Sequence, residues 1–143
     1  CSLVGQIESP LEAFVNPSSF KIYQADTGLL VSKAGAQRAD ILAGIGGTFV
    51  GALTENYVAQ QLSAIGYPLH YWTRDNRAEI DFVVERQGCV SAIEVKAGEN
   101  TRSRSLSSLK KSHPGVRLIR LSTKPFGMNE GLRSIPLYAA FCL

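Results

Sequence analysis

The side chains with the clearest chemical potential are two carboxylates and a lysine in neighbouring segments. Residues 79–85 contain Asp81, and residues 90–96 contain Glu94 and Lys96. Both segments alternate between apolar and polar residues and are rich in β-branched side chains, which is typical of half-buried strands. The short connection between them contains Gly88, a residue suited to a turn. The sequence therefore predicts an antiparallel hairpin that carries all three charged groups.

The register of this hairpin decides which side chains meet. If Glu85 pairs with Val90, then Asp81 stands directly opposite Glu94. Because side chains alternate with a period of two, Asp81, Glu94 and Lys96 are expected on one face of the sheet. The other face is expected to carry the apolar side chains of Ile80, Phe82, Val84, Ile93 and Val95.

Two carboxylates in directly opposed positions repel each other, so they need a cation, a shared proton or open water between them. Hard divalent cations such as Mg²⁺ are commonly held by one or two carboxylates together with water and substrate oxygens. Asp81 and Glu94, with the backbone carbonyl of Val95, would supply such ligands. Lys96 would orient a water or stabilise developing negative charge. This combination predicts a metal-dependent phosphodiesterase site.

An alternative interpretation needs no metal. Glu79 falls opposite Lys96 in the same register, so these residues would form a plain cross-strand ion pair. Asp81 and Glu94 would then face solvent. The spacing of the residues alone leaves both interpretations open.

A third carboxylate is expected from a helix over residues 48–65. Glu55 shares a helical face with the apolar residues Val58, Ala59 and Leu62, and a carboxylate in such a stripe is costly unless it is paired. We expect Glu55 to approach the hairpin as an accessory carboxylate; the alternative places it at the edge of the stripe, in water. The glycines at 44–47 lack the GK[ST] ending of a phosphate-binding loop, and no nucleotide-binding signature occurs in the chain.

The remaining segments complete an α/β pattern. A strand is expected at residues 69–72, a second helix at 102–111, a further strand at 116–121, and an apolar tail that packs on the core from residue 135. Near the N-terminus, Pro10 and Pro17 are expected to interrupt regular structure, residues 20–23 read as a short strand, and Asp26 is a candidate helix cap. The predicted core order is helix, three strands, helix, strand.

Composition sets further bounds. The 143 residues suit one domain, and 45% hydrophobic with 19% charged residues are values of an ordinary soluble globular protein. The sequence contains no apolar run of membrane-spanning length and no signal peptide, so no membrane association is expected. The three cysteines lack metal-binding spacing, which favours a reducing cytoplasm as the location.

The net charge is only +3, so any affinity for nucleic acid must come from local clustering. Four basic residues gather around the second expected helix: Arg102, Arg104, Lys110 and Lys111. They are candidates for phosphate contacts. A solvated basic helix face is the alternative.

The helix–strand–strand placement of Glu55, Asp81 and the Glu94–Lys96 tripeptide resembles the PD-(D/E)xK nuclease superfamily. Ile80 stands where proline often precedes the aspartate in that pattern. More closely, the chain from about residue 20 is similar to a domain of unknown function found at the C-terminus of prokaryotic AAA+ family ATPases. The motifs that carry this likeness are residues 21–30, 51–58, 71–72, 79–82, 93–96, 105–106 and 135–138.

The resemblance implies a restriction-endonuclease-like αβββαβ core, a central mixed sheet flanked by helices, over residues 20–143. Residues 1–19 would then be an N-terminal extension, the remnant of an upstream segment. The resemblance also implies Mg²⁺ or Mn²⁺ as cofactor, DNA as substrate, and an upstream ATPase module in the same polypeptide that uses ATP. A catalytically silent module that binds nucleic acid or protein for the ATPase is the second interpretation.

Overall fold

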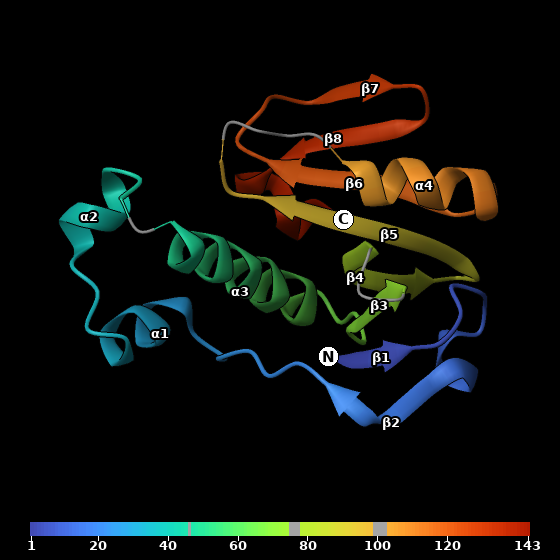
Figure 1. The fold of residues 1–143 in the computed structure, drawn as a ribbon, viewed down its shortest axis with the longest axis horizontal. Helices are drawn as coiled ribbons and strands as arrows, with labels where there is room; N and C mark the ends of the chain where they lie inside the picture. The colour runs from blue at the N-terminus through green and yellow to red at the C-terminus, as the bar shows by residue number, and fades with distance from the viewer. Residues whose placement is uncertain (46, 75–77, 99–102) are drawn as a thin grey trace.

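The computed structural model describes residues 1–45, 47–74, 78–98 and 103–143. Its core is an eight-stranded mixed sheet with the strand order β2-β1-β3-β4-β5-β6-β8-β7 (Figure 1). In chain order the strands are β1 (Ser2–Val4), β2 (Val15–Phe20), β3 (His70–Arg74), β4 (Ala78–Arg86), β5 (Cys89–Lys96), β6 (Arg117–Ser122), β7 (Gly127–Asn129) and β8 (Leu132–Pro136). The expected α/β class with a mixed sheet is confirmed.

The helices lie beside the sheet and beyond it. They are η1 (Leu11–Phe14), α1 (Thr27–Lys33), α2 (Arg38–Leu42), α3 (Thr48–Ala64), α4 (Arg104–Ser112) and η2 (Leu137–Cys142), with η1 and η2 of the 3₁₀ type. Figure 1 shows α1 and α2 extending away from the sheet at the far end of α3. Asp26 caps α1 as predicted, because its Oδ1 accepts a hydrogen bond from the N–H of Leu29 at 2.7 Å.

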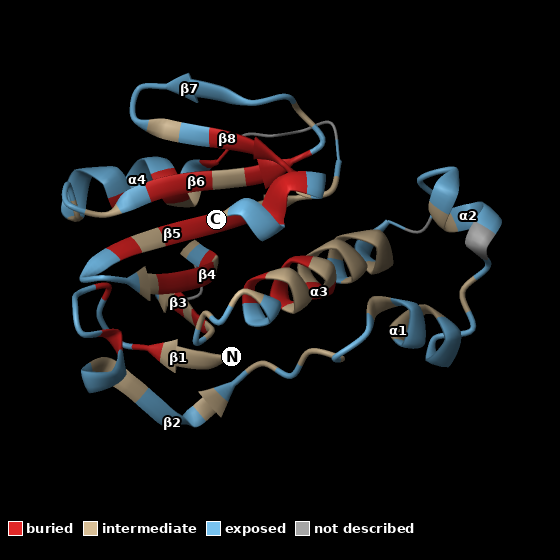
Figure 2. Cartoon of the chain, turned by 180° about the vertical axis from the view of Figure 1, so that it is seen from behind, coloured by how far each residue is buried: buried red, intermediate tan, exposed pale blue. Residues whose placement is uncertain are grey.

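Two apolar clusters cover the two faces of the sheet. One contains Leu106 and Leu109 of α4 together with Val83 and Ala92 of the central hairpin. The other joins residues of α3 and η2 to the opposite side of the hairpin, including Val58, Leu62, Phe82, Val84, Ile93, Ala139 and Ala140. Figure 2 shows the buried residues concentrated on β4, β5, β6, β8 and one side of α3, whereas α1 and α2 are largely exposed. The sheet is therefore flanked by helices, as expected.

The central hairpin has the predicted register. Glu85 pairs with Val90, and the same pairing continues to Phe82 opposite Ile93, where the ladder between β4 and β5 ends. The predicted pair Asp81–Glu94 would be the next one and lies beyond this ladder. The observed order α3, β3, β4, β5, α4, β6 also matches the predicted order helix, three strands, helix, strand. The period-two and helical patterns of these segments were sufficient to place them.

The prediction that Ile80 shares a face with Phe82 is wrong. Ile80 packs in the cluster under α4, whereas Phe82 packs in the cluster under α3. The cause is a β-bulge: between the pairs His70–Val83 and Trp72–Ile80, β4 advances three residues while β3 advances two. Asp81 lies inside this bulge, so the strict alternation behind the predicted shared face of the three charged groups does not hold there.

The N-terminal segment is more regular than predicted. Strand β2 covers residues 15–20 and includes Pro17, whereas residues 21–24 are not a strand. Proline is tolerated because β2 is the edge strand of the sheet, where a missing N–H costs no ladder hydrogen bond. β1 pairs with β2 and β3, which brings the N-terminal residues into the sheet. The predicted boundary at residue 19 stays a prediction.

Two whole-chain features complete the fold. All three cysteines are free thiols in the structure. Within the described ranges, no helix has the length and apolar character needed to cross a membrane.

Candidate functional site

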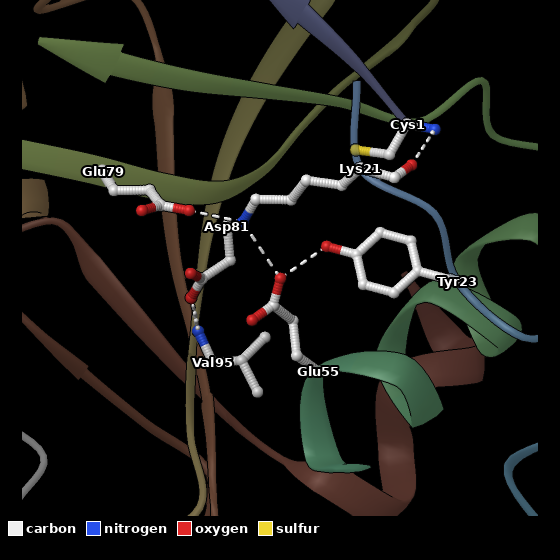
Figure 3. Close-up of polar contacts among 7 residues, drawn as sticks. All are labelled: Cys1, Lys21, Tyr23, Glu55, Glu79, Asp81 and Val95. Atoms are coloured by element: carbon white, nitrogen blue, oxygen red, sulfur yellow. Dashed lines mark hydrogen bonds and ion pairs between the residues drawn. The ribbon is translucent and has the colours of Figure 1, made fainter. Parts of the chain in front are cut away.

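Asp81 ties the end of β4 to β5 through its side chain. Its Oδ2 accepts a hydrogen bond from the backbone N–H of Val95 at 2.7 Å (Figure 3). This contact lies just beyond Phe82 and Ile93, the last paired residues of the β4–β5 ladder. The carboxylate thus satisfies a backbone donor that the diverging strands no longer pair, and it lies between the two strands.

Beside Asp81, Lys21 makes ion pairs with two carboxylates. Its Nζ lies 3.1 Å from Oε1 of Glu55 and also contacts Glu79, and the hydroxyl of Tyr23 donates to the same Glu55 oxygen. Figure 3 shows the side chains of Lys21, Tyr23 and Glu55 pointing toward one another next to Asp81. Burial lowers the pKa of Lys21, but hydrogen bonds and charge from the two glutamates outweigh it and raise the pKa overall. The site therefore contains a stable protein cation.

The surroundings of Asp81 disfavour the charged form of its carboxyl group. Burial is the main cause that raises its pKa to about 7; the hydrogen bond from Val95 opposes this shift, as does the charge of Lys21. The charges of Glu55 and Glu94 add to the upward shift. Asp81 is thus coupled to both glutamates.

Glu94 and Lys96 form a separate pair on β5. Lys96 Nζ lies 2.7 Å from Glu94 Oε1, and the Glu94 side chain is only 7% exposed. The second oxygen of Glu94, Oε2, is buried and has no hydrogen-bond partner among the described residues. Such an oxygen is costly in a protein interior and marks a place where a further cation or donor would be favourable.

The predicted site residues therefore form two linked groups. Glu55 pairs with Lys21, and the charges of both act on Asp81; Glu94 pairs with Lys96, and its charge also acts on Asp81. Across the described ranges, no three or more His, Cys, Asp and Glu side chains are arranged to hold a metal ion. Each of the three carboxylates already has a partner in the protein: Glu55 pairs with Lys21, Glu94 pairs with Lys96, and Asp81 accepts the N–H of Val95.

Two alternatives from the sequence are wrong in the structure. Glu79 does not pair with Lys96; it stands opposite Thr73 of β3, and its carboxylate pairs with Lys21. Glu55 is not a solvated residue at the edge of a stripe, since it receives contacts from Lys21 and Tyr23. The ladder between β4 and β5 ends at Phe82 and Ile93, so Glu79 and Lys96 are not paired residues.

Polar side chains of α3 form hydrogen bonds with the segment that contains Lys21. Buried Asn56 accepts a hydrogen bond from the N–H of Gln24 at 2.8 Å and donates to the Gln24 carbonyl at 3.1 Å. One turn later, Gln60 accepts from both the N–H and the hydroxyl of Thr27. We call residues 21–27 the strap.

Sequence reasoning did not assign a site role to Lys21, Tyr23 or Asn56. Lys21 and Tyr23 stand two apart in an extended segment, with Ile22 between them 80% exposed. That alternation was visible as a strand-like pattern. Their partner on α3 was not visible, because it depends on how the strap crosses the helix.

The basic residues of the second helix, α4, have other partners than these carboxylates in the described part of the chain. Arg104, Lys110 and Lys111 are exposed on α4, and Lys110 donates to the carbonyl of Glu130. Lys110 and Lys111 line a hollow between α4 and the β6–β8 region, together with Arg120. Arg102 lies outside the described residues. These positions suit phosphate contacts as well as plain solvation.

The fold and site together define an α/β domain with an eight-stranded mixed sheet and a carboxylate–lysine cluster at the divergence of two central strands. Residues 50–140 match the family described as "Domain of unknown function (DUF4143)", and the chain belongs to that family. No solved structure matches it.

The chain is also similar to two longer mycobacterial proteins. It is 36% identical over 105 residues to the uncharacterized protein Rv2008c of Mycobacterium tuberculosis and, to the same extent, to the uncharacterized protein Mb2031c of Mycobacterium bovis. The match covers 71% of this chain and 23% of each relative. The chain thus spans about a quarter of the length of these relatives.

Proposed function

We propose that this chain is a Mg²⁺-dependent nuclease domain that hydrolyses DNA phosphodiester bonds. The observation that carries the proposal is the state of Glu94. It is a buried carboxylate paired through one oxygen with Lys96, while its other oxygen has no partner in the described part of the chain. A buried carboxylate with one unpaired oxygen lowers the stability of the fold, and such groups are concentrated at functional sites.

The donor set fits a hard divalent cation in its chemistry. The candidate ligands are oxygens of Asp81 and Glu94 and the carbonyl of Val95, with Glu55 as an accessory carboxylate. Mg²⁺ is commonly held by one or two carboxylates with water and substrate completing its shell. Oε2 of Glu94 is the buried oxygen that such an ion would satisfy. When bound, the ion would acidify a coordinated water and offset charge on the phosphate.

The residues of the chain have distinct roles in this proposal. Asp81 is positioned by the Val95 N–H, which fixes its carboxylate at the divergence of β4 and β5. Lys96, held by Glu94 and 29% exposed, has its ammonium group available to the developing negative charge. Exposed Arg104, Lys110 and Lys111 would contact the DNA backbone.

The wider assignment rests on the resemblance to the PD-(D/E)xK superfamily and to the C-terminal domains of AAA+ ATPases. The observed order helix, three strands, helix, strand supports a restriction-endonuclease-like core. The greater length of the mycobacterial relatives is compatible with a larger polypeptide that includes an ATPase module.

One observation favours a second function. Lys21 already supplies a protein cation to Glu55 and Glu79, so part of the negative charge at the site is balanced without metal. A catalytically silent module that binds nucleic acid or protein for the ATPase would need no more than this.

Nicking of supercoiled plasmid separates the two functions. The wild-type chain and the variants Asp81→Asn, Glu94→Gln and Lys96→Met are each assayed with Mg²⁺, Mn²⁺ or EDTA. The nuclease proposal expects metal-dependent nicking by the wild type and by the charge-matched control Lys33→Met, on exposed α1, and no nicking by the three site variants. Retained DNA binding without nicking by wild type would favour the silent module.

A further inference from the structure

We propose that Lys21 is a built-in cation of the carboxylate site that a divalent metal must displace from Glu55. The strap, residues 21–27, places the ammonium group of Lys21 on the accessory carboxylate, Glu55, and the ammonium stays there until a metal binds. The inference rests on the proposed metal site and adds a regulatory step to it.

The contacts of Lys21 are those of a partly buried counter-ion. Its side chain is 27% exposed, and its Nζ is shared between Glu55 and Glu79. The same ammonium lies 5.1 Å from the centre of the Tyr71 ring, within range of a cation–π interaction. A surface lysine has no comparable set of contacts, so the ammonium is held in place.

Glu55 has little capacity left for another cation. Its Oε1 receives both Lys21 Nζ and the hydroxyl of Tyr23, and these groups come from the same extended segment. A divalent ion that recruits Glu55 must compete with the ammonium for that carboxylate, because two cations this close repel each other. Binding of metal and seating of Lys21 are therefore mutually unfavourable.

The backbone of the strap is held at both ends, so that only the side chain of Lys21 has to move. The N–H of Lys21 donates to the Cys1 carbonyl at 2.8 Å, and its carbonyl accepts from the Cys1 amino group at 3.2 Å. Asn56 and Gln60 hold Gln24 and Thr27 at the far end of the strap. Ile22, between Lys21 and Tyr23, is 80% exposed and adds no buried contact of its own. Displacement of the Lys21 side chain alone thus breaks its contacts with Glu55, Glu79 and Tyr71 and leaves the packing of Tyr23 on Phe82 in place.

The direct test is the accessibility of the Lys21 amine to an acylating reagent, read by peptide mass spectrometry with and without millimolar Mn²⁺. Calorimetry on the same samples measures whether Mn²⁺ binds. The proposal expects slow acylation of Lys21 in EDTA and an increase of about fivefold when metal is bound, as for a lysine released from a partly buried ion pair. Lys33, exposed on α1, should react equally in both conditions.

A second variant provides an independent measurement. Lys21→Met should bind Mn²⁺ about five- to tenfold more tightly than wild type in calorimetry, because the competing ammonium is gone. Lys33→Met removes a charge away from the site and should leave the affinity unchanged. Because both readouts concern binding, they do not depend on nuclease activity.

The outcomes separate this inference from the proposed function. If Mn²⁺ binds but Lys21 stays protected and Lys21→Met binds no more tightly, the inference is overturned while the metal site remains. If calorimetry detects no Mn²⁺ binding to wild type or to Lys21→Met, the metal site of the proposed function fails and the inference fails with it. Increased acylation together with tighter binding by Lys21→Met supports both.

Discussion

The carboxylate of Asp81 receives the backbone N–H of Val95 at 2.7 Å, directly beyond the last paired residues of β4 and β5. A side chain thereby closes the ladder where the backbone no longer does. The contact holds the carboxylate between the strands, partly shielded from water, and close enough to Glu55 and Glu94 for their charges to act on it. The position of the carboxylate between the strands is therefore also the reason why its pKa is raised.

The first prediction concerns Asp81→Asn in the absence of metal. The pKa of Asp81 is raised from 3.8 to about 7, chiefly by burial, so the fold favours the protonated acid. Below about pH 4 the carboxyl is protonated in both folded and unfolded chains and costs nothing; as pH rises to about 7 the unfolded chain ionises first and stability is lost. Above pH 7 the asparagine variant should be more stable by about 2 kcal/mol, a value discounted for solvent relaxation.

Urea unfolding in EDTA at pH 4 and pH 8 measures this difference. The gain of Asp81→Asn over wild type should be present at pH 8 and almost vanish at pH 4. Asp40→Asn, at an exposed position on α2, controls for the loss of a charge. An equal gain at both pH values would show that the carboxyl of Asp81 is not destabilised by burial.

The hairpin illustrates what could be predicted from the sequence. Its register followed from two alternating segments and a short turn, because a one-residue shift would have moved every apolar side chain to the wrong face. The same local patterns placed α3, α4 and β6 close to their observed bounds. Helical periodicity left open whether Glu55 approaches the hairpin or lies in water; in the structure Glu55 pairs with Lys21, and the charges of both act on Asp81.

The parts that could not be predicted depend on contacts distant in sequence. The bulge at Asp81 arises from the pairing of β4 with β3, and no pattern within residues 78–86 indicates the extra residue. The roles of Lys21 and Asn56 require knowing that the strap crosses α3, some 30 residues later in the chain. Periodicity reports which face a residue takes, but not which segment will cover it.

The second prediction concerns the pair Glu94–Lys96. Lys96→Met leaves a buried carboxylate without its cation, so the free energy of unfolding should fall by about 2–3 kcal/mol, toward the low end for buried pairs because Lys96 is partly exposed. Glu94→Gln combined with Lys96→Met removes both charges and should recover most of that loss. Urea unfolding of the two single variants and the double variant completes the cycle.

The sign of the coupling decides this prediction. A double variant that is clearly more stable than Lys96→Met alone shows that the loss came from an uncompensated Glu94 charge. Additive losses would mean that Glu94 and Lys96 stabilise the fold independently. The interaction free energy of the ion pair would then be close to zero.

The third prediction concerns the anchor of the strap. Asn56 is 3% exposed and makes two hydrogen bonds to the backbone of Gln24, so Asn56→Ala leaves a donor and an acceptor of the strap unpaired. The expected loss in free energy of unfolding is about 1–3 kcal/mol. Amide hydrogen exchange should also accelerate in residues 21–27 more than in β4 and β5. Ser63→Ala, at an exposed position on the same helix, should change neither measurement.

The last prediction separates phosphate contacts from chemistry. If Arg104 and Lys111 contact the DNA backbone, replacing both with alanine should weaken binding to all DNA sequences alike. The slope of log affinity against log salt should become shallower by about 0.9 for each lost phosphate contact, because fewer counterions are released. Lys96→Met should instead leave affinity and slope nearly unchanged while nicking is lost, since its ammonium is expected to act on charge that develops in the transition state. Fluorescence anisotropy over a salt series, with Lys33→Ala as the charge control, gives both values. An unchanged slope in the Arg104→Ala/Lys111→Ala variant would mean that α4 presents only a solvated basic face, and the DNA-contacting surface would have to be sought elsewhere on the domain.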